Sequence, residues 1–300
     1  NENEYLTNVV QISSYSNTTY ALTADGIVYA FGYNGYGQIG NATTASITLY
    51  PNKMKKIENV VQVDAGENFA IMLDTNSNVW TTGYNGYGQL GTNNTNTYTI
   101  PQQVKSTDGT SLLSGIKKVS ASSISAIMLS ENGNVYGMGY NGYGQLGTNN
   151  TNTYYLPQLM KLSDGTEITN AKDILSSGYN TMVITADKGV TIVGYNNYGQ
   201  LFTKNQTTDN KFRTVEDDKN IILLAETSNI SNQTSAIVDE SGKVFTAGYN
   251  GNGERGNDLQ ITLISPSNIS NTQIEVDKAR VILNLDTTTN STHKIKANIN

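Results

Sequence analysis

Short apolar runs separated by turn signals recur along the chain. The runs VVQV (60–63), FAIML (69–73) and NVWTT (78–82) are rich in Val, Ile and aromatic residues, the composition that pleated strands favour. Between such runs stand Asp-Gly, Asn-Gly and Ser-Gly pairs, which are hairpin signals. No window keeps apolar residues at helical spacing over three turns. The pattern therefore predicts an all-β protein.

A repeated phrase gives these runs a period. GYNGYGQLGTNNTNTY occupies both 83–98 and 139–154. At a steady spacing of 51, 56, 55 and 54 residues, its opening Gly-Tyr-Asn recurs in five copies, which begin at Gly32, Gly83, Gly139, Gly194 and Gly248. A steady period in this range is typical of stacked or radial repeats. Each copy is therefore expected to mark one structural unit.

The prolines occupy one phase of this repeat. Pro51, Pro101, Pro157 and Pro266 each follow the preceding repeat glycine by 18 or 19 residues. Because proline cannot donate to a sheet ladder, it is confined to edge strands, strand starts and bulges. This predicts an outer edge strand in each unit, which brings the strands to four. Four-stranded sheets repeated about an axis are the blades of a β-propeller, here with five repeat units visible.

Glycine is concentrated in the same copies, which hold 18 of the 28 glycines. An L-residue forced into the left-handed region costs roughly 1–2 kcal/mol, and glycine avoids that cost. The copies therefore predict loops with fixed positive φ angles, placed where one blade leads into the next. On this interpretation the phrase is a structural joint rather than a reaction centre.

The pattern V-x-Q-V-x-A-G, an apolar strand, Asp/Asn-Gly and V-Y-x-x-G-x-N-x-x-G-Q-L-G resembles the repeat of the regulator of chromosome condensation family. GYNGYGQIG (32–40) and GYNGYGQLG (83–91, 139–147) keep it nearly intact, whereas GYNNYGQLF (194–202) and GYNGNGERG (248–256) depart from it. The resemblance covers about residues 8–268 and implies a propeller, usually of seven blades. With five units, either the ring closes with fewer blades or further repeats lie upstream of Asn1.

A second resemblance lies at 273–300, which is similar to the first two strands of a bacterial immunoglobulin-like domain of the group-two kind. We therefore expect propeller repeats in 1–270, and a partial immunoglobulin-like domain or a terminal hairpin in 271–300; another blade stays open. The resemblance implies a multidomain bacterial surface protein. The opening NENEY, without Met or an apolar leader, leads us to expect a processed or excised piece.

Charge and composition narrow the function classes. The chain has no cysteine, a formal charge of −6 and a pI near 4.9. Disulfides, thiolate metal sites and a cysteine nucleophile are thereby excluded. Affinity for nucleic acid without sequence preference requires a basic face, so no nucleic-acid partner is expected. No run of about 18 apolar residues occurs, so we expect no membrane insertion.

Few residues offer catalytic or metal chemistry. His293, the one histidine, lies outside the repeats, so Ser-His-Asp, Cys-His and histidine zinc sites are excluded. DTNSNVW (74–80) begins like a calcium loop, but Val79 stands where such loops need glycine, and we interpret it as a turn. Asp64 and Glu67 have no charged equivalents in the third unit. A glycosidase dyad across blades stays open, but we expect no enzyme, metal or cofactor.

Tyrosine is the remaining candidate for function, since nine of the 19 lie inside the Gly-Tyr-Asn copies. For most of them we expect packing between blades, with each hydroxyl bonded to the backbone. The alternative is a rim of Tyr, Asn and Thr that works like a binding loop, together with the uncharged loops at 92–98 and 148–154. The candidate binding rim comprises Tyr36, Tyr87, Tyr98, Tyr143, Tyr154, Tyr198, Asn94 and Asn150.

These features favour a non-catalytic binding or adhesion module, extracellular or at a bacterial cell surface, that presents a propeller rim to a protein or glycan. The alternative is a secreted enzyme inhibitor, because the resemblance includes a propeller that plugs β-lactamase. Guanine-nucleotide exchange is less favoured. The exchange factors of that family insert a wedge, and here the repeat spacing varies by only five residues.

Overall fold

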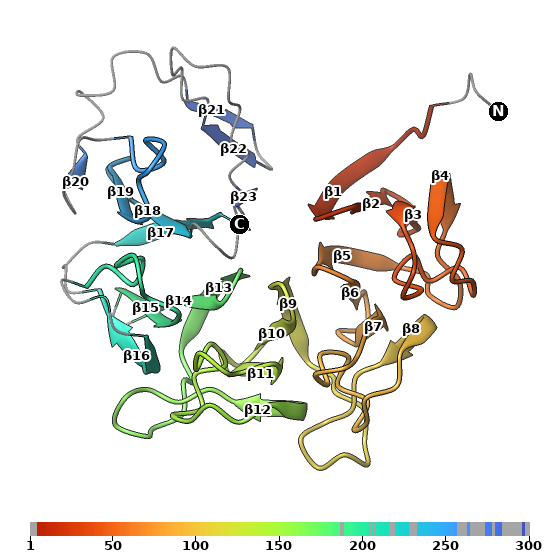
Figure 1. Cartoon of the computed structure of the whole chain (residues 1–300), viewed down its shortest axis with the longest axis horizontal. Helices are drawn as coiled ribbons and strands as arrows, with labels where there is room; N and C mark the ends of the chain where they lie inside the picture. Colours follow the sequence, from red (N-terminus) through yellow and green to blue (C-terminus); the bar gives the residue numbers. More distant parts are fainter. Residues whose placement is uncertain are drawn as a thin grey trace.

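The computed structural model describes residues 5–186, 189–203, 206, 208–215, 220–227, 233–256, 263–264, 274–277, 280–283 and 296–297. Every regular element in these ranges is a β-strand, and five antiparallel sheets follow one another around an axis as an arc (Figure 1). Each sheet contains four consecutive strands that pair in chain order. The prediction of a β-propeller with four-stranded blades is confirmed.

The blades are numbered from the N-terminus. Blade 1 consists of β1 (Val9–Tyr15), β2 (Thr18–Thr23), β3 (Val28–Tyr33) and β4 (Ile47–Lys53). Blade 2 consists of β5 (Val60–Ala65), β6 (Phe69–Asp74), β7 (Val79–Gly83) and β8 (Tyr98–Gln103). Blade 3 consists of β9 (Ile116–Ala121), β10 (Ser125–Ser130), β11 (Val135–Gly139) and β12 (Tyr154–Leu159).

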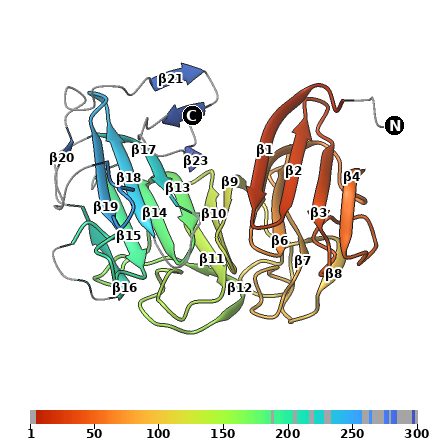
Figure 2. The same ribbon diagram turned by 45° about the horizontal axis from the view of Figure 1, so that its top comes forward.

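Blade 4 consists of β13 (Ala171–Ser177), β14 (Asn180–Thr185), β15 (Gly189–Gly194) and β16 (Asp209–Thr214). Blade 5 consists of β17 (Ile221–Glu226), β18 (Thr234–Asp239), β19 (Val244–Gly248) and β20 (Leu263–Ile264). In every blade the first strand lies nearest the axis and the fourth lies outermost (Figure 1). The blades stand side by side in the turned view (Figure 2).

The outermost strands carry the prolines. Pro51, Pro101 and Pro157 lie in β4, β8 and β12, as the phase of the repeat predicted. At this edge a residue without an N–H removes no ladder bond. Pro266 lies outside the described residues.

The Gly-Tyr-Asn loops are not where the sequence placed them. Each lies inside a blade and connects the third strand to the fourth, whereas the chain passes between blades 1 and 2 through residues 54–59. The five repeat glycines have φ between 99° and 124°. At Gly83 an added β-carbon would lie 2.4 Å from the carbonyl oxygen of Asn68. Glycine is needed at this position because the turn between β5 and β6 lies directly against its Cα.

These loops nevertheless join neighbouring blades without a covalent link. A β-carbon on Gly37 would lie 2.8 Å from the Cα of Thr99 in blade 2, and one on Gly88 would lie 2.7 Å from the Cα of Tyr155 in blade 3. Just beyond each glycine, the N–H of Ala42 donates to the Thr99 carbonyl (2.9 Å), and the N–H of Asn93 donates to the Tyr155 carbonyl (3.1 Å). The outer strands of blades 2 and 3 therefore rest on the glycine loops of the blades that precede them.

Side chains complete this contact near the axis, where the inner strands of neighbouring blades lie side by side without pairing as a sheet. The Gln11 amide of blade 1 donates to the Val63 carbonyl (2.9 Å) and accepts from the Val63 N–H (3.0 Å). Gln62 does the same for Val119 (2.8 and 3.0 Å). Ser13 accepts from the Ala65 N–H (2.9 Å). A side-chain amide thus replaces the missing strand neighbour.

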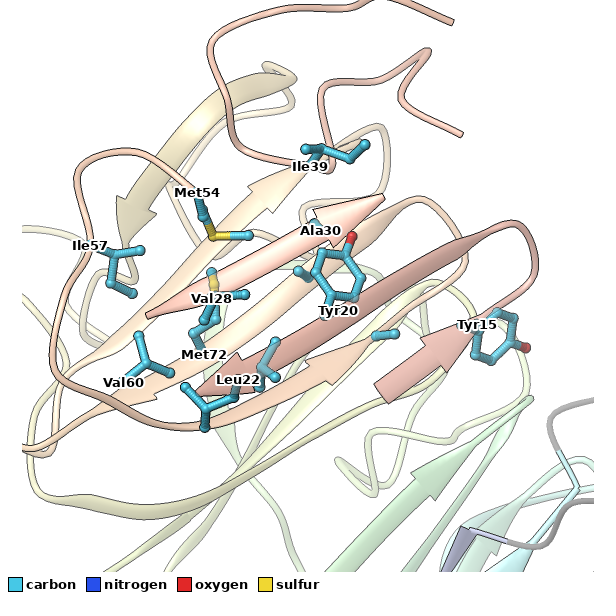
Figure 3. Close-up of a cluster of buried hydrophobic side chains, with 13 residues drawn as sticks. Tyr15, Tyr20, Leu22, Val28, Ala30, Ile39, Met54, Ile57, Val60 and Met72 are labelled. Carbon is cyan, nitrogen blue, oxygen red and sulfur yellow. The ribbon is translucent and has the colours of Figure 1, made fainter. Parts of the chain in front are cut away.

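We call each of these contacts a blade joint. Its donor half lies on the preceding blade and consists of the inner-strand side chains and the glycine loop. Its receptor half lies on the following blade and consists of the backbone that they bond and the sheet face around it. Apolar side chains fill the space between the halves: Leu22 and Val28 of blade 1 pack with Met72 of blade 2 (Figure 3).

The joint between blades 3 and 4 uses an ion pair where the earlier joints use glutamine. Lys118 occupies the position of Gln62 and forms a salt bridge with Asp173, and both side chains are about nine-tenths buried. The same Asp173 carboxylate accepts from the Ile174 N–H (2.8 Å). The joint is therefore kept although its chemistry has changed from neutral to charged.

Short strands follow blade 5. β21 (Ile274–Asp277) and β22 (Arg280–Leu283) pair antiparallel, and β23 (Lys296–Ala297) adds to the inner edge of β17. The immunoglobulin-like extension and the boundary at residue 270 stay predictions. His293 lies outside the described residues.

Candidate functional site

Ten tyrosine rings form a continuous row across all five blades. Neighbouring centroids lie 4.7–6.3 Å apart, all in edge-to-face or tilted geometry. Such contacts each stabilise by about 0.5–1.5 kcal/mol beyond the area they bury. This tyrosine row consists of Tyr33, Tyr36, Tyr84, Tyr87, Tyr140, Tyr143, Tyr179, Tyr195, Tyr198 and Tyr249.

In the first four copies a buried asparagine sets the two tyrosines of the copy on the same rim. In blade 2, Asn85 lies between Tyr84 and Tyr87; its Oδ1 accepts from the Leu90 N–H (2.9 Å) and its Nδ2 donates to the Asn94 carbonyl (2.9 Å). Asn34, Asn141 and Asn196 bond the corresponding backbone N–H groups in their own blades. The loop is closed from inside, so the tyrosines on either side point outward.

The glycine between the two tyrosines provides room for the first ring. A β-carbon on Gly86 would lie 2.0 Å from the Tyr84 hydroxyl, and one on Gly142 would lie 2.1 Å from the Tyr140 hydroxyl. For most of these hydroxyls a bond to the backbone between blades had been expected. The hydroxyls of Tyr84 and Tyr140 lie over their own loops instead. In the fourth copy Asn197 replaces this glycine, and its side chain hydrogen-bonds Tyr195.

The rings meet across the blade joints but remain half-exposed. Tyr36 contacts Tyr84, and Tyr87 contacts Tyr140, each across a joint. Tyr36 and Tyr87 keep 38% of their surface exposed. Burial, with repulsion from neighbouring tyrosines, raises the pKa of the Tyr84 and Tyr140 hydroxyls. The row thus presents hydroxyls and partly exposed ring surfaces side by side on the blades that hold them.

The candidate rim divides into two groups in the structure. Tyr36, Tyr87, Tyr143 and Tyr198 belong to the tyrosine row. The other four residues form two matching pairs, each of a loop asparagine and the tyrosine that begins the outer strand: the Asn94 amide donates to the Tyr98 hydroxyl (3.1 Å), and the Asn150 amide donates to the Tyr154 hydroxyl (2.9 Å). Both of these tyrosines also pack on the core clusters of their blades. They support the loops at 92–98 and 148–154.

One member of the tyrosine row was not predicted from the sequence. Tyr179 lies in the turn between β13 and β14 and contacts both Tyr140 and Tyr143. It stands in a Gly-Tyr-Asn at 178–180 that is out of phase with the five copies. That phrase was a usable signal, but its phase gave no indication that the ring would reach the row.

The carboxylates that were considered as candidates for catalysis or calcium binding have structural partners. Asp64 accepts from the Ser13 hydroxyl and the Ala121 N–H, both at 2.8 Å, within two blade joints. Glu67 accepts from the Ser123 hydroxyl (2.8 Å). Asp74 accepts from the N–H groups of Asn76 and Asn78, so its loop is a hairpin turn. In the described part of the chain no group of three acidic or histidine side chains could hold a metal.

Beside the row, a buried polar cluster joins blades 4 and 5. The Asn180 amide donates to Glu226 Oε1 (2.7 Å) and to Gln233 Oε1 (3.1 Å), and Gln200 donates to the same Gln233 oxygen (3.1 Å). Glu226 Oε2 has no hydrogen-bond partner among the described residues. Burial raises the pKa of the Glu226 carboxyl to about 8, because the interior disfavours its charged form.

Replacing Glu226 with glutamine is expected to flatten the pH dependence of stability. The raised pKa means that the folded state binds the proton more tightly than the unfolded state does. The contribution of this proton to the free energy of unfolding is complete below about pH 4.5 and is lost as the pH rises towards 8. Between these pH values the free energy of unfolding falls by about 1.4 kcal/mol per pH unit. At pH 8 Glu226→Gln should exceed the wild type in free energy of unfolding by at least about 2 kcal/mol.

Urea titrations that follow the fluorescence of Trp80 at pH 5 and pH 8 measure this difference. Glu240→Gln, at the exposed end of the same hairpin, is the matched control and should leave the slope unchanged. Parallel pH profiles for wild type and Glu226→Gln would contradict the assignment.

Among the described residues no helix is long and apolar enough to cross a bilayer.

Known proteins resemble the chain over most of its length. In sequence it is 31% identical over 209 residues to the human protein named "Probable E3 ubiquitin-protein ligase HERC4", which covers 69% of this chain and 19% of that protein. It is 24% identical over 196 residues to the ultraviolet-B receptor UVR8 of Arabidopsis thaliana, covering 64% and 43%. The chain therefore spans less than half of either relative.

Solved structures show the same fold. Human WBSCR16 matches with a TM-score of 0.68 at 21% identity, over 83% of this chain and 63% of that chain. Yeast RCC1 (Prp20), in its complex with Kap60, matches with a TM-score of 0.66 at 18% identity, over 80% and 56%. The RCC1-like domain family matches residues 1–286. With the fold and the repeat motif in agreement, this chain belongs to the RCC1-like domain family.

Proposed function

We propose that this propeller is a non-catalytic binding module that presents the tyrosine row to a protein partner. The row is the observation that carries the proposal. Tyrosine supplies a large contact area at low ordering cost and is enriched at binding hot spots. A standard protein contact buries about 1,600 Å² in total, so the partner would contact several blades at once.

We further propose that the module acts outside the cell, at a bacterial surface. The resemblance of residues 273–300 to a bacterial immunoglobulin-like domain supports this location. Protease treatment of intact cells of the source organism tests it. Loss of antibody-detected protein from intact cells agrees with a surface location, and protection until the cells are lysed contradicts it.

Loss of the exposed rings is expected to weaken partner binding strongly. The variant Tyr36→Ala/Tyr87→Ala/Tyr143→Ala should weaken binding by at least about 100-fold, because hot-spot truncations cost 2 kcal/mol or more each. The partner is first captured by photo-cross-linking from a benzoyl-phenylalanine placed at position 87. Its affinity for the wild type and the variants is then measured by calorimetry.

Two exposed apolar side chains away from the row provide the control. Tyr5 is 92% exposed and Leu112 is 51% exposed, and Tyr5→Ala/Leu112→Ala should leave the affinity within about threefold, as for most contacts outside a hot spot. Full retention of the partner by the triple variant would overturn the proposal. A glycan caught by the same cross-linker in place of a protein would overturn the partner class.

A further inference from the structure

Four contacts of the tyrosine row repeat one spacing at successive blade joints. The two rings that meet across a joint have centroids 5.0–5.2 Å apart, whereas the two rings of a single copy lie 6.1–6.3 Å apart. These joint pairs are Tyr36 with Tyr84, Tyr87 with Tyr140, Tyr143 with Tyr195, and Tyr198 with Tyr249. Each of the four joints therefore holds two phenols from neighbouring blades in contact.

Tyrosine is also the easily oxidised side chain that the fold leaves accessible. The chain has no cysteine. Trp80, the one tryptophan, packs against a core cluster and donates its indole N–H to Asp74 (2.9 Å). Tyr36 and Tyr87, by contrast, keep 38% of their surface exposed. Because oxidation follows exposure, a one-electron oxidant in solution meets tyrosine first. All six methionines are buried: Met54, Met72, Met128, Met138, Met160 and Met182.

Contact along the row lets a radical formed at one ring reach another. Neighbouring centroids are nowhere more than 6.3 Å apart, so an electron passes from ring to ring without crossing other parts of the protein. Two radicals on the same row therefore meet, and they meet most closely at the joints. At the joint between blades 3 and 4, Tyr143 also contacts Tyr179 at 4.7 Å, which gives that joint a second possible link.

We propose that the tyrosine row is an oxidative cross-linking site, at which one-electron oxidation joins the two rings of a joint pair through a carbon–carbon bond. The oxidant is hydrogen peroxide acting through a peroxidase. Each link fastens two neighbouring blades covalently, in a chain whose lack of cysteine excludes disulfides. The proposal does not depend on partner binding by the row, and its test contains no partner.

The coupling is balanced in atoms and electrons. Each of the two tyrosines loses one electron and its hydroxyl proton and becomes a phenoxyl radical. The radicals join through ring carbons next to the carbon that bears oxygen, and the hydrogen on each joined carbon then moves to its oxygen, which restores both phenols. One hydrogen peroxide takes up the two electrons and two protons and becomes two water molecules. The planes of the joint pairs are inclined at 59–77°, so the edge that reacts in one ring already points at the other ring.

Treatment of the purified full chain with a peroxidase and hydrogen peroxide, followed by trypsin and mass spectrometry, tests the proposal. Lysines separate the members of every joint pair, such as Lys53 between Tyr36 and Tyr84. Two tryptic peptides therefore stay together only where a link joins them, with a mass two hydrogen atoms below their sum. At about 1 µM protein, joint-pair links should exceed links between chains by at least about 100-fold, because a ring held in contact has an effective concentration of about a millimolar or more.

Tyr84→Phe keeps the ring but removes the hydroxyl that is oxidised, so it should abolish the link to Tyr36 and leave the link between Tyr143 and Tyr195. The matched control is Tyr50→Phe, which removes a phenol that is 57% exposed and lies outside the row; it should leave every joint-pair link unchanged. An oxidised wild type without joint-pair links would overturn the proposal. It would also be overturned if links between chains, or links that involve tyrosines outside the row, predominated.

Discussion

Replacing Gly83 with alanine is expected to destabilise the protein by about 3 kcal/mol. Gly83 has φ of +107°, which costs an L-residue about 1–2 kcal/mol. Its new β-carbon would also lie 2.4 Å from the Asn68 carbonyl oxygen and 2.8 Å from the Cα of Phe69. Both neighbours are backbone atoms, so neither can turn aside. Urea unfolding followed by Trp80 fluorescence measures the loss.

Gly115 separates the two causes. Its φ of +71° is also positive, but an added β-carbon would meet nothing within 4 Å. Gly115→Ala should therefore cost only the conformational part, about 1 kcal/mol. Equal losses at Gly83 and Gly115 would show that the close approach of the neighbouring hairpin contributes nothing.

Removal of the buried lysine between blades 3 and 4 is expected to have an effect of similar size. Lys118→Met leaves the Asp173 carboxylate, about nine-tenths buried, without its cation. A buried charge that loses its partner costs about 3–5 kcal/mol. Thermal and urea unfolding of the purified chain should show this loss.

A neutral pair should restore most of that stability. Lys118→Gln/Asp173→Asn removes both charges and returns the joint to the amide that Gln11 and Gln62 supply in the earlier joints. We expect the double variant to lie within about 1–2 kcal/mol of the wild type, since replacing both partners of a buried pair is often nearly neutral. Additive losses in the double variant would rule out direct coupling between the two residues.

Membership of the family does not by itself decide between the functions considered for this chain. Relatives with this domain carry names as different as a ubiquitin-protein ligase and an ultraviolet-B receptor, so the fold alone does not select an activity. Among the described residues, the loops between the third and fourth strands carry the same two tyrosines in blades 1 to 4, the first of them alone in blade 5, and no larger insertion. A partner that reads a continuous rim fits this regularity better than one that needs a single protruding wedge.

The periodic sequence by itself determined the architecture. Alternating short runs and Asn-Gly turns specify antiparallel strands locally, and Pro51, Pro101 and Pro157 mark the outer strand because a missing N–H is tolerated only at an edge. These signals act within one unit of about 50 residues. For that reason the all-β class and the four strands per blade could be predicted without knowing how the units meet.

Tertiary structure decided what the repeats do to one another. The glycine loops were expected between blades along the chain, yet they lie inside each blade and join the next blade through contacts such as Gly37 with Thr99. Tyr179 meets Tyr143, 36 positions away, and Glu226 meets Asn180, 46 positions away, only because neighbouring blades stack on one another. Local sequence does not encode such neighbours; packing about a common axis creates them.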